Sequence, residues 1–253
     1  MKMLLAFINK ELLEQWKNYK IMILFSALAI FGMTSPVLAK MMPDIFSQTD
    51  MGFTISIPEA TYIDAYAQFF KNMTQICMML VILIFSTNIT QELQKGSAII
   101  MFSKGLPRTT FIAAKFIAAV LIWTVGYVLS AAVFYGYTAF LFPSQSPQNV
   151  VLSMVCLWVL VVFVLSILTV TSVISSQSYV PLLLTAGIMA LQLVINTFSN
   201  IARYSPLALG TYNMELITGV KSINDVYLPL AIAAGLTILC ISAAIAVFRR
   251  RQL

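Results

Sequence analysis

Long apolar segments alternate with short polar ones along the chain, and this pattern predicts an all-α membrane protein. A helix needs about 20 residues to cross a bilayer, and six segments are apolar over roughly that length or more. We expect a single transmembrane domain, residues 1–253, whose six membrane-spanning helices lie in residues 21–39, 69–89, 109–142, 150–173, 180–198 and 227–248.

The third apolar run, residues 109–142, is longer than one span requires. We therefore expect its first part, with Lys115, to remain at the membrane interface, where a lysine ammonium group can reach water. The alternative places Lys115 near the middle of the membrane at a cost of about 2.5 to 3.5 kcal/mol, so the interface is favoured.

The first 20 residues show a helical pattern of their own. Charged residues, including Lys10, Glu11 and Glu14, follow a short apolar start at once, and no small-residue cleavage site appears, so this segment is not a signal peptide. We expect an amphipathic helix in the headgroup plane, or an ordinary helix packed on a partner protein. Its apolar face would comprise Leu5, Ile8, Leu12, Trp16 and Tyr19.

A polar stretch, residues 91–108, separates the second and third apolar segments. Gly96 and Pro107 favour a short helix bounded by turns, because glycine releases the backbone and proline cannot continue a preceding helix. The charged side chains of the stretch are Glu92, Lys95, Lys104 and Arg108. Such a short, charged piece between two spans is suited to contact a soluble partner.

The other connections differ in length. We expect a polar loop over residues 41–68, and a second loop over residues 199–226 whose apolar middle, residues 207–220, forms a short re-entrant or interfacial helix. Residues 143–147 and 175–178 are short uncharged turns, and the second forces the fourth and fifth spans into an antiparallel hairpin.

Composition and charge support this assignment. The chain is 60% hydrophobic and only 9% charged, whereas a soluble domain carries about 25% charged residues. The net charge of +6 comes from short basic clusters beside apolar runs and not from an extended basic face, which argues against a nucleic-acid partner. Because Lys and Arg gather on the cytoplasmic side, we expect both termini in the cytoplasm, with the tail residues Arg249, Arg250 and Arg251 acting as an orientation signal.

The sequence lacks the residues that most enzymes use. It contains no histidine, and Lys95-Gly96-Ser97 lacks the glycine spacing of a nucleotide-binding loop. The three cysteines, Cys77, Cys156 and Cys240, fall inside apolar segments and are expected to be small hydrophobic residues, so no metal site is predicted. We therefore expect no catalytic activity in this chain.

Uncharged amides are the main polar groups of the predicted spans, which carry no interior Asp or Glu. Amides inside a bundle can line a path for an amphipathic cargo, but they more often form hydrogen bonds between helices. The candidate cargo path consists of Asn72, Gln75, Asn88, Gln192 and Asn196.

Several motifs resemble the ABC-2 type permeases, the membrane subunits of ATP-binding-cassette exporters. They are residues 9–14 (Asn-Lys-Glu-Leu-Leu-Glu), Glu92-x-x-x-Gly96-Ser97, residues 104–108 (Lys-Gly-Leu-Pro-Arg) with Lys115, residues 204–206 (Tyr-Ser-Pro), and residues 248–253 (Phe-Arg-Arg-Arg-Gln-Leu). The match covers essentially the whole chain, and the stretch from Glu92 to Arg108 is its most specific part.

This resemblance implies a fold and a set of roles. The fold would be the ABC-2 (type V) exporter architecture, with residues 1–20 as an elbow helix that includes Lys10, Glu11, Glu14 and Trp16. A coupling element would dock on an ATPase subunit through Gln91, Glu92, Lys95, Gly96 and Ser97, with Pro107 and Arg108 at its end. Two copies of the permease would face each other in the bacterial cytoplasmic membrane, and ATP and Mg²⁺ would bind the partner ATPase subunits and not this chain.

Three functions remain open from the sequence. The first is export of a hydrophobic or amphipathic cargo, such as a peptide toxin, an antimicrobial peptide or a drug, which the methionine-rich composition would suit. The second is an ATPase-linked membrane anchor or sensor that moves no cargo. The third is a self-contained channel or carrier.

Overall fold

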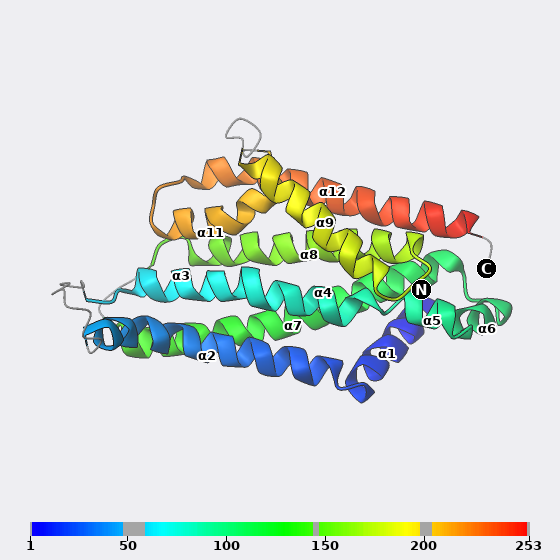
Figure 1. Ribbon diagram of the computed structural model, residues 1–253, viewed down its shortest axis with the longest axis horizontal. Coiled ribbons are helices and arrows are strands. Elements are labelled where there is room, and N and C mark those ends of the chain that lie inside the picture. The colour runs from blue at the N-terminus through cyan, green and yellow to red at the C-terminus, as the bar shows by residue number, and fades with distance from the viewer. Residues whose placement is uncertain (1, 48–58, 144–146, 198–203, 252–253) are drawn as a thin grey trace.

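The computed structural model is all-helical in the parts of the chain that it describes, residues 2–47, 59–143, 147–197 and 204–251 (Figure 1). The first half contains α1 (Lys2–Lys17), α2 (Lys20–Ser47), α3 (Tyr62–Asn72), the π-helical turn η1 (Met73–Cys77), α4 (Met78–Ser86), α5 (Thr90–Gln94) and α6 (Ser97–Ser103). The second half contains α7 (Arg108–Leu141), α8 (Val150–Ile174), α9 (Val180–Asn196), the 3-10 turn η2 (Pro206–Ala208), α11 (Leu209–Ile217) and α12 (Ile223–Arg250).

Within the described part of the chain, five helical segments are long and apolar enough to cross a membrane: Lys20–Pro43, Tyr62–Gln94, Arg108–Leu141, Val150–Ile174 and Ile223–Arg250. The protein is therefore a multi-pass membrane protein. The fifth predicted span corresponds to α9, an apolar helix of 17 residues, which is shorter than the other five. The position of Phe198, the predicted end of that span, lies outside the described residues.

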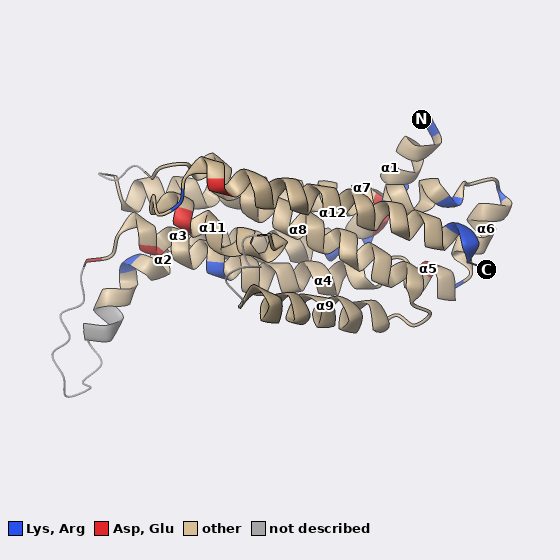
Figure 2. Ribbon diagram, turned by 90° about the horizontal axis from the view of Figure 1, so that it is seen from above, with Lys and Arg blue, Asp and Glu red and all other residues tan. Residues whose placement is uncertain are grey.

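The long helices lie roughly side by side, and α1 leaves the bundle at an angle (Figure 1). Both ends of the chain, α5 and α6 lie at one end of the bundle, which we call the terminal end. The end of α2, the start of α3, the end of α7 and the start of α8 lie at the opposite end. Charged residues gather at the two ends and leave the middle of the bundle almost free of charge (Figure 2).

Small residues let α2 and α7 approach closely. A β-carbon at Gly32 would lie 2.7 Å from the carbonyl oxygen of Ser130, and the Ser130 hydroxyl donates a 2.6 Å hydrogen bond to the carbonyl of Leu28. Close backbone approach at small residues, joined by hydroxyl hydrogen bonds, is how helices associate where lipid removes the hydrophobic driving force. The two helices consequently form one of the most extensive helix pairs of the fold.

Aromatic side chains fill the interior between α3 and α7. The rings of Phe69 and Phe134 stack with centroids 4.2 Å apart, and Tyr66 meets Phe134 edge-on at 4.8 Å. All three residues are fully buried. Such offset-stacked and edge-on pairs each stabilise the fold by about 0.5 to 1.5 kcal/mol beyond the contribution from burying the rings.

The connection between α2 and α3 is shorter than predicted. Residues 41–68 were expected to form a polar loop, but α2 continues to Ser47 and α3 begins at Tyr62. Pro36 and Pro43 lie within α2, because membrane helices tolerate proline better than soluble ones do. At the other boundary, the Asp64 carboxylate accepts hydrogen bonds from the backbone N–H and the hydroxyl of Thr61, which forms a capping box at the start of α3. Residues 48–58 lie outside the described part of the chain.

The connection between α9 and α12 contains a short helix, as its apolar middle suggests. This helix, α11, packs against α8, and its residues Leu209 and Leu216 are fully buried. Lys221 follows it and lies 3.2 Å from the centroid of the Tyr212 ring, with an ion pair of 3.3 Å to Glu215. Residues 199–203 of the predicted loop lie outside the described residues.

Candidate functional site

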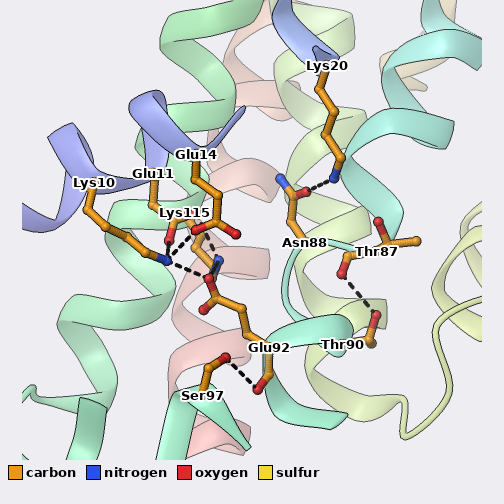
Figure 3. Close-up of polar contacts among 10 residues, drawn as sticks. All are labelled: Lys10, Glu11, Glu14, Lys20, Thr87, Asn88, Thr90, Glu92, Ser97 and Lys115. Atoms are coloured by element: carbon orange, nitrogen blue, oxygen red, sulfur yellow. Dashed lines mark hydrogen bonds and ion pairs between the residues drawn. The ribbon is translucent and has the colours of Figure 1, made fainter. Parts of the chain in front are cut away.

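A cluster of five charged side chains joins three separate elements at the terminal end (Figure 3). Lys10 Nζ from α1 lies 2.6 Å from Glu92 Oε1 of α5, 3.0 Å from Glu11 Oε1 and 2.6 Å from Glu14 Oε2. Lys115 Nζ from α7 lies 2.9 Å from Glu11 Oε2 and 3.1 Å from Glu92 Oε1. We call these five residues the ionic cluster.

The centre of the ionic cluster is buried. Glu11, Glu92 and Lys115 are 1%, 7% and 5% exposed, whereas the side chains of Lys10 and Glu14 are each 39% exposed. Charges removed from water must be paired with good geometry, because an unpaired buried charge costs several kcal/mol. The cluster therefore ties α1, α5 and α7 together, and a movement of α5 would break ion pairs to both other helices.

The environment shifts the pKa values at the outer edge of the cluster. Burial tends to lower the pKa of Lys10, but hydrogen bonds to Glu14 and Glu92 and the charge of Glu11 outweigh it and hold the pKa above its usual value. Burial tends to raise the pKa of Glu14, yet the hydrogen bond and charge of Lys10 lower it on balance. Both groups are therefore charged at neutral pH.

The cluster already holds its own cations. The carboxylates of Glu11, Glu14 and Glu92 lie within 4.8 Å of one another, a grouping that could otherwise hold a metal ion. The ammonium groups of Lys10 and Lys115 lie among these oxygens and occupy the positions that a cation would take.

The predicted coupling region consists of two short helices separated by Gly96. Gly96 has a φ of 70°, in the left-handed region that favours glycine, and it serves as the N-cap of α6. The Ser97 hydroxyl donates to the carbonyl of Glu92 at 3.2 Å, which fastens the turn. The predicted short helix bounded by turns is therefore a pair of helices, with a glycine hinge where the sequence places a breaker.

The exposed surface of the predicted coupling region is polar near α5 and apolar on α6. Gln91 and Lys95 are exposed and, with members of the ionic cluster, line a cavity of about 390 Å³. On α6, Ile99 and Ile100 are 49% and 58% exposed. The Glu92 side chain points into the ionic cluster instead of outward, so a surface contact between this carboxylate and a partner does not fit its position.

An aromatic cluster underlies α6. Phe102 packs edge-on against Phe111 and Phe248, whose rings stack at 5.6 Å, and Phe7 of α1 contacts Phe111 at 5.7 Å. It joins α1, α6, α7 and α12 through apolar contacts, beside the polar contacts of the ionic cluster. Together the two clusters make the terminal end a single packed unit.

Arginines fasten the carboxyl-terminal ends of two helices. Arg108 donates hydrogen bonds to the carbonyl oxygens of Arg251 at 2.6 Å and Arg249 at 3.1 Å. Arg251 in turn donates to the carbonyls of Val173 and Ser175 at the end of α8, at 2.5 and 3.0 Å. Arg251 thus has a structural role beyond the predicted orientation signal, and Pro107 is the N-cap of α7, exposed to solvent.

Helix α1, the predicted elbow helix, presents a different face to the bundle from the one predicted. Of the expected apolar face, Leu5, Trp16 and Tyr19 are exposed, and Ile8 is buried. The face against the bundle contains Phe7, Ile8, Glu11 and Gln15. The exposed apolar residues can face lipid, while two polar residues point inward.

The predicted position of Lys115 needs correction, and Lys20 also has a partner within the chain. The Lys115 ammonium group was expected to reach water, but it is buried and bonded to two carboxylates. Lys20, at the start of α2, donates a 2.7 Å hydrogen bond to Asn88 Oδ1 (Figure 3). Both lysines are satisfied inside the chain by partners distant in sequence.

The amides of the candidate cargo path lie in different surroundings. Asn72 donates a 3.0 Å hydrogen bond to Ser35 of α2 and so joins two helices, which is one of the two roles that the sequence left open for these amides. Asn88 accepts a hydrogen bond from Lys20 at the terminal end. Gln75 is exposed on η1. Gln192 and Asn196, one helical turn apart on α9, each have a buried side-chain oxygen without a hydrogen-bond partner. Within the described part of one copy, these residues do not form one continuous path.

Comparison with known proteins gives a distant relative. No protein-family model matches the sequence. The chain is similar to an uncharacterized transmembrane protein, YxlG, of Bacillus subtilis (strain 168), with 25% identity over 169 residues that cover 63% of this chain and 64% of the relative. The chain thus matches less than two thirds of that protein's length. This similarity supports a multi-pass membrane protein with a bacterial homologue, and it assigns neither a family nor an activity.

Proposed function

We propose that this chain is the membrane subunit of an ATP-driven exporter of the ABC-2 permease type and works with a separate ATPase subunit. The observation that carries the proposal is the position of α5, Gly96 and α6. This segment comprises the end of the candidate span Tyr62–Gln94 and its connection to α7 at the terminal end, and α6 presents Ile99 and Ile100 there without a covering element in the described structure. An exposed apolar pair on a short helix outside the spans favours docking to a soluble partner.

The terminal end would face the cytoplasm. Among the described residues, the basic side chains of the elements at this end are Lys2, Lys10, Lys17, Lys20, Lys95, Lys104, Arg108, Lys115, Arg249, Arg250 and Arg251, and those of the segments toward the opposite end are Lys40, Lys71 and Lys221. This asymmetry follows the rule that Lys and Arg concentrate on the cytoplasmic side. The soluble ATPase, with its ATP and Mg²⁺, would then meet α6 from the cytoplasm of a bacterial cell.

The ionic cluster gives this docking segment a mechanical connection to the bundle. A push on α6 passes through Gly96 to α5, where Glu92 is bonded to Lys10 of α1 and Lys115 of α7. Because both ion pairs are at least partly buried, breaking them is costly, so the three elements should move together. In this proposal Glu92 transmits the movement and does not touch the ATPase.

A second copy of the chain would complete the transporter. Gln75 lies on the exposed side of η1 beside Ile76 and near Met79, where lipid offers an amide no hydrogen bond. A facing copy supplies partners for such a group. The cargo is proposed to be hydrophobic or amphipathic, since the membrane-spanning interior between the two charged ends is almost uncharged.

Co-purification tests the proposal. The chain is extracted from its native membrane in mild detergent, and the soluble proteins that accompany it are identified by mass spectrometry. We expect an ATPase in equal copy number, and we expect I99D/I100D to lose it. The matched control V220D changes an exposed apolar residue at the opposite end, and it should retain the ATPase. Recovery of a homo-oligomer without an ATPase would overturn the proposal and favour a channel or carrier.

Cargo movement separates an exporter from a membrane sensor. In sealed vesicles that contain both subunits, an exporter accumulates a cargo on one side and its ATPase rate responds to the same cargo. A sensor shows the change in ATPase rate without accumulation.

A further inference from the structure

A cavity of about 870 Å³ lies between α7 and α8, toward the end of the bundle opposite the termini. Its walls come from α3, α7 and α8, and none of its lining residues is charged. The volume falls within the range of sites that hold small organic molecules, roughly 300 to 1,000 Å³. The cavity is separate from the ionic cluster and from the amides of the candidate cargo path.

Two hydroxyl groups of the lining residues have no hydrogen-bond partner. Tyr66 is 0% exposed and Thr138 is 5% exposed, and the hydroxyl oxygens of both are buried and unbonded. Buried polar groups are nearly always paired, because an unsatisfied hydroxyl costs about 1 to 3 kcal/mol. Two such groups on one cavity indicate that a hydrogen-bond acceptor belongs there.

Three further polar groups of the cavity, on Thr124, Tyr127 and Trp158, have partners. Tyr127 donates to the carbonyl of Met154 at 3.1 Å, and Trp158 donates to the Thr124 hydroxyl at 2.9 Å. The Thr124 hydroxyl itself donates to the carbonyl four residues earlier, as do those of Thr34, Thr169 and Thr237 in other helices. Thr138 lacks this bond, so its hydroxyl remains free to donate to a molecule in the cavity.

The cavity opens on the surface that lipid would cover. Val128 and Tyr135 of α7 and Val151 of α8 line it and are 58%, 59% and 78% exposed. Because α7 and α8 are candidate spans, Val128 and Tyr135 would face lipid in the membrane, and Val151 lies near the end of its span. A molecule can therefore enter from the bilayer without crossing water.

The polar and apolar parts of the cavity are arranged along α7. Thr138 lies within one turn of the end of that helix at Leu141, close to where the bilayer becomes polar. From Thr138 to Thr124 the helix advances about 21 Å, which is more than half of a hydrocarbon core of about 30 Å. An occupant with an uncharged acceptor at one end and a long apolar chain that reaches into one leaflet fits this arrangement.

We propose that this cavity is a binding site for an ester-linked membrane glycerolipid. One acyl chain lies between α7 and α8, and its ester carbonyl accepts hydrogen bonds from the hydroxyls of Tyr66 and Thr138. The site does not depend on the proposed ATPase partner, so the lipid site and the exporter function can each be wrong without affecting the other.

Photolabelling tests the site. The purified chain is placed in nanodiscs of phosphatidylethanolamine and phosphatidylglycerol with a trace of phosphatidylcholine that carries a diazirine on its acyl chain. After illumination, the labelled peptides are identified by mass spectrometry. We expect labelling of the segment from Val150 to Trp158 that saturates and is competed by unlabelled ester lipid, whereas lipid-facing residues such as Leu239 on α12 label without saturation.

Removing the hydroxyls should weaken the competed labelling while leaving the fold intact. For Y66F/T138V we expect about a tenfold loss of affinity, as two hydrogen bonds would contribute. The matched control Y227F/T237V removes the same groups from α12 and should label like the original chain. A131W, which fills the cavity, should abolish the competed labelling, and gel filtration checks that each variant remains folded.

The competitor identifies the occupant. An ether-linked lipid lacks the ester carbonyl, and we expect it to compete about tenfold less well than its ester counterpart. Equal competition by the two lipids, or unchanged labelling in Y66F/T138V, would overturn the role of the carbonyl. Labelling that never saturates, or a cavity covered by a second copy and closed to the probe, would overturn the lipid site itself.

Discussion

Lys115 and Glu11, 104 positions apart in the sequence, form a 2.9 Å ion pair in which both side chains are almost fully buried. The pair fastens the long helix α7 to the amino-terminal helix α1. Since Lys115 also contacts Glu92, its removal leaves two carboxylates without their shared cation.

We expect K115M to destabilise the protein by about 3 to 5 kcal/mol, the cost of leaving buried charge uncompensated. Thermal unfolding of the purified protein in detergent measures this, with the exposed Lys95 changed to methionine as the control. The double variant E11Q/K115M should lose less than the sum of the two single changes. Additive losses would show that the two residues do not interact.

The pH dependence of stability should follow the shifts at Lys10 and Glu14. The pKa of Glu14 is lowered from 4.5, so its contribution is present above pH 4.5 and is lost as the pH falls through its folded pKa. The pKa of Lys10 is raised from 10.5, so its contribution is present below pH 10.5 and is lost as the pH rises through its folded pKa. The contributions of both groups should therefore be constant near neutral pH.

The difference in stability between the original protein and E14Q should be constant near neutral pH and should shrink as the pH falls through the folded pKa of Glu14. The effect will be small, because a partly exposed ion pair is screened by solvent. Glu59, an exposed glutamate with no ion pair among the described residues, provides the control E59Q. A difference between E14Q and the original protein that changes between pH 6 and 9 would contradict the assignment.

Gly96 provides a test of backbone geometry alone. A β-carbon at Gly96 would meet nothing within 4 Å, but its φ of 70° disfavours any side chain. G96A should cost about 1 to 2 kcal/mol. The control G136A places a β-carbon in equally open space within α7, where alanine favours the helix, and it should be neutral or stabilising. Equal effects of the two changes would argue against the left-handed turn.

Gly32 provides the complementary test of close packing. G32A would force a β-carbon against the backbone of Ser130, so we expect a loss of about 1 to 3 kcal/mol as α2 and α7 separate. G235A, in α12 with nothing within 4 Å, is the matched control. Thermal unfolding of the two variants compares them directly, and an unchanged G32A would show that the two helices do not meet there.

Variants of Arg250 and Arg251 separate the effect of a positive charge from the effect of a specific hydrogen bond. R251A and R250A each remove one positive charge, but only Arg251 donates to the end of α8. We expect R251A to lose about 1 to 3 kcal/mol of stability and R250A less than about 0.5 kcal/mol. If the arginines act only as an orientation signal, the two variants will be equally stable.

Much of the fold follows from the apolar pattern. The starts and ends of α7 and α8 fall within one residue of the predicted segments, because these helices coincide with uninterrupted apolar runs. The boundary of α3 was missed although its signal is in the sequence: Thr61 and Asp64 have the spacing of a capping box. Ser222 and Asp225 repeat this spacing at the start of α12 and explain why that helix begins four residues before the predicted position.

The ionic cluster could not be predicted from the sequence. Glu11, Glu92 and Lys115 are each ordinary charges in segments far apart, and a single sequence does not show which segments meet. The sequence also could not predict that the hydroxyls of Tyr66 and Thr138 lack partners, since whether a hydroxyl forms a hydrogen bond depends on packing. The helix break at Gly96 was predicted correctly because it depends on the backbone conformation of the glycine itself and not on residues distant in the sequence.

The π-helical turn η1 lets the second candidate span hold an extra residue without turning its two halves relative to each other. A π turn holds one more residue than an α turn needs, whereas each residue added to a regular helix rotates the remainder of that helix by about 100°. Because the wide turn absorbs the extra residue, α3 and α4 keep the orientation that they would have in a regular helix one residue shorter. Asn72 at the end of α3 can therefore bond to Ser35 while Val81 of α4 is fully buried, and a regular helix of the same length would turn one of these two side chains away from its surroundings.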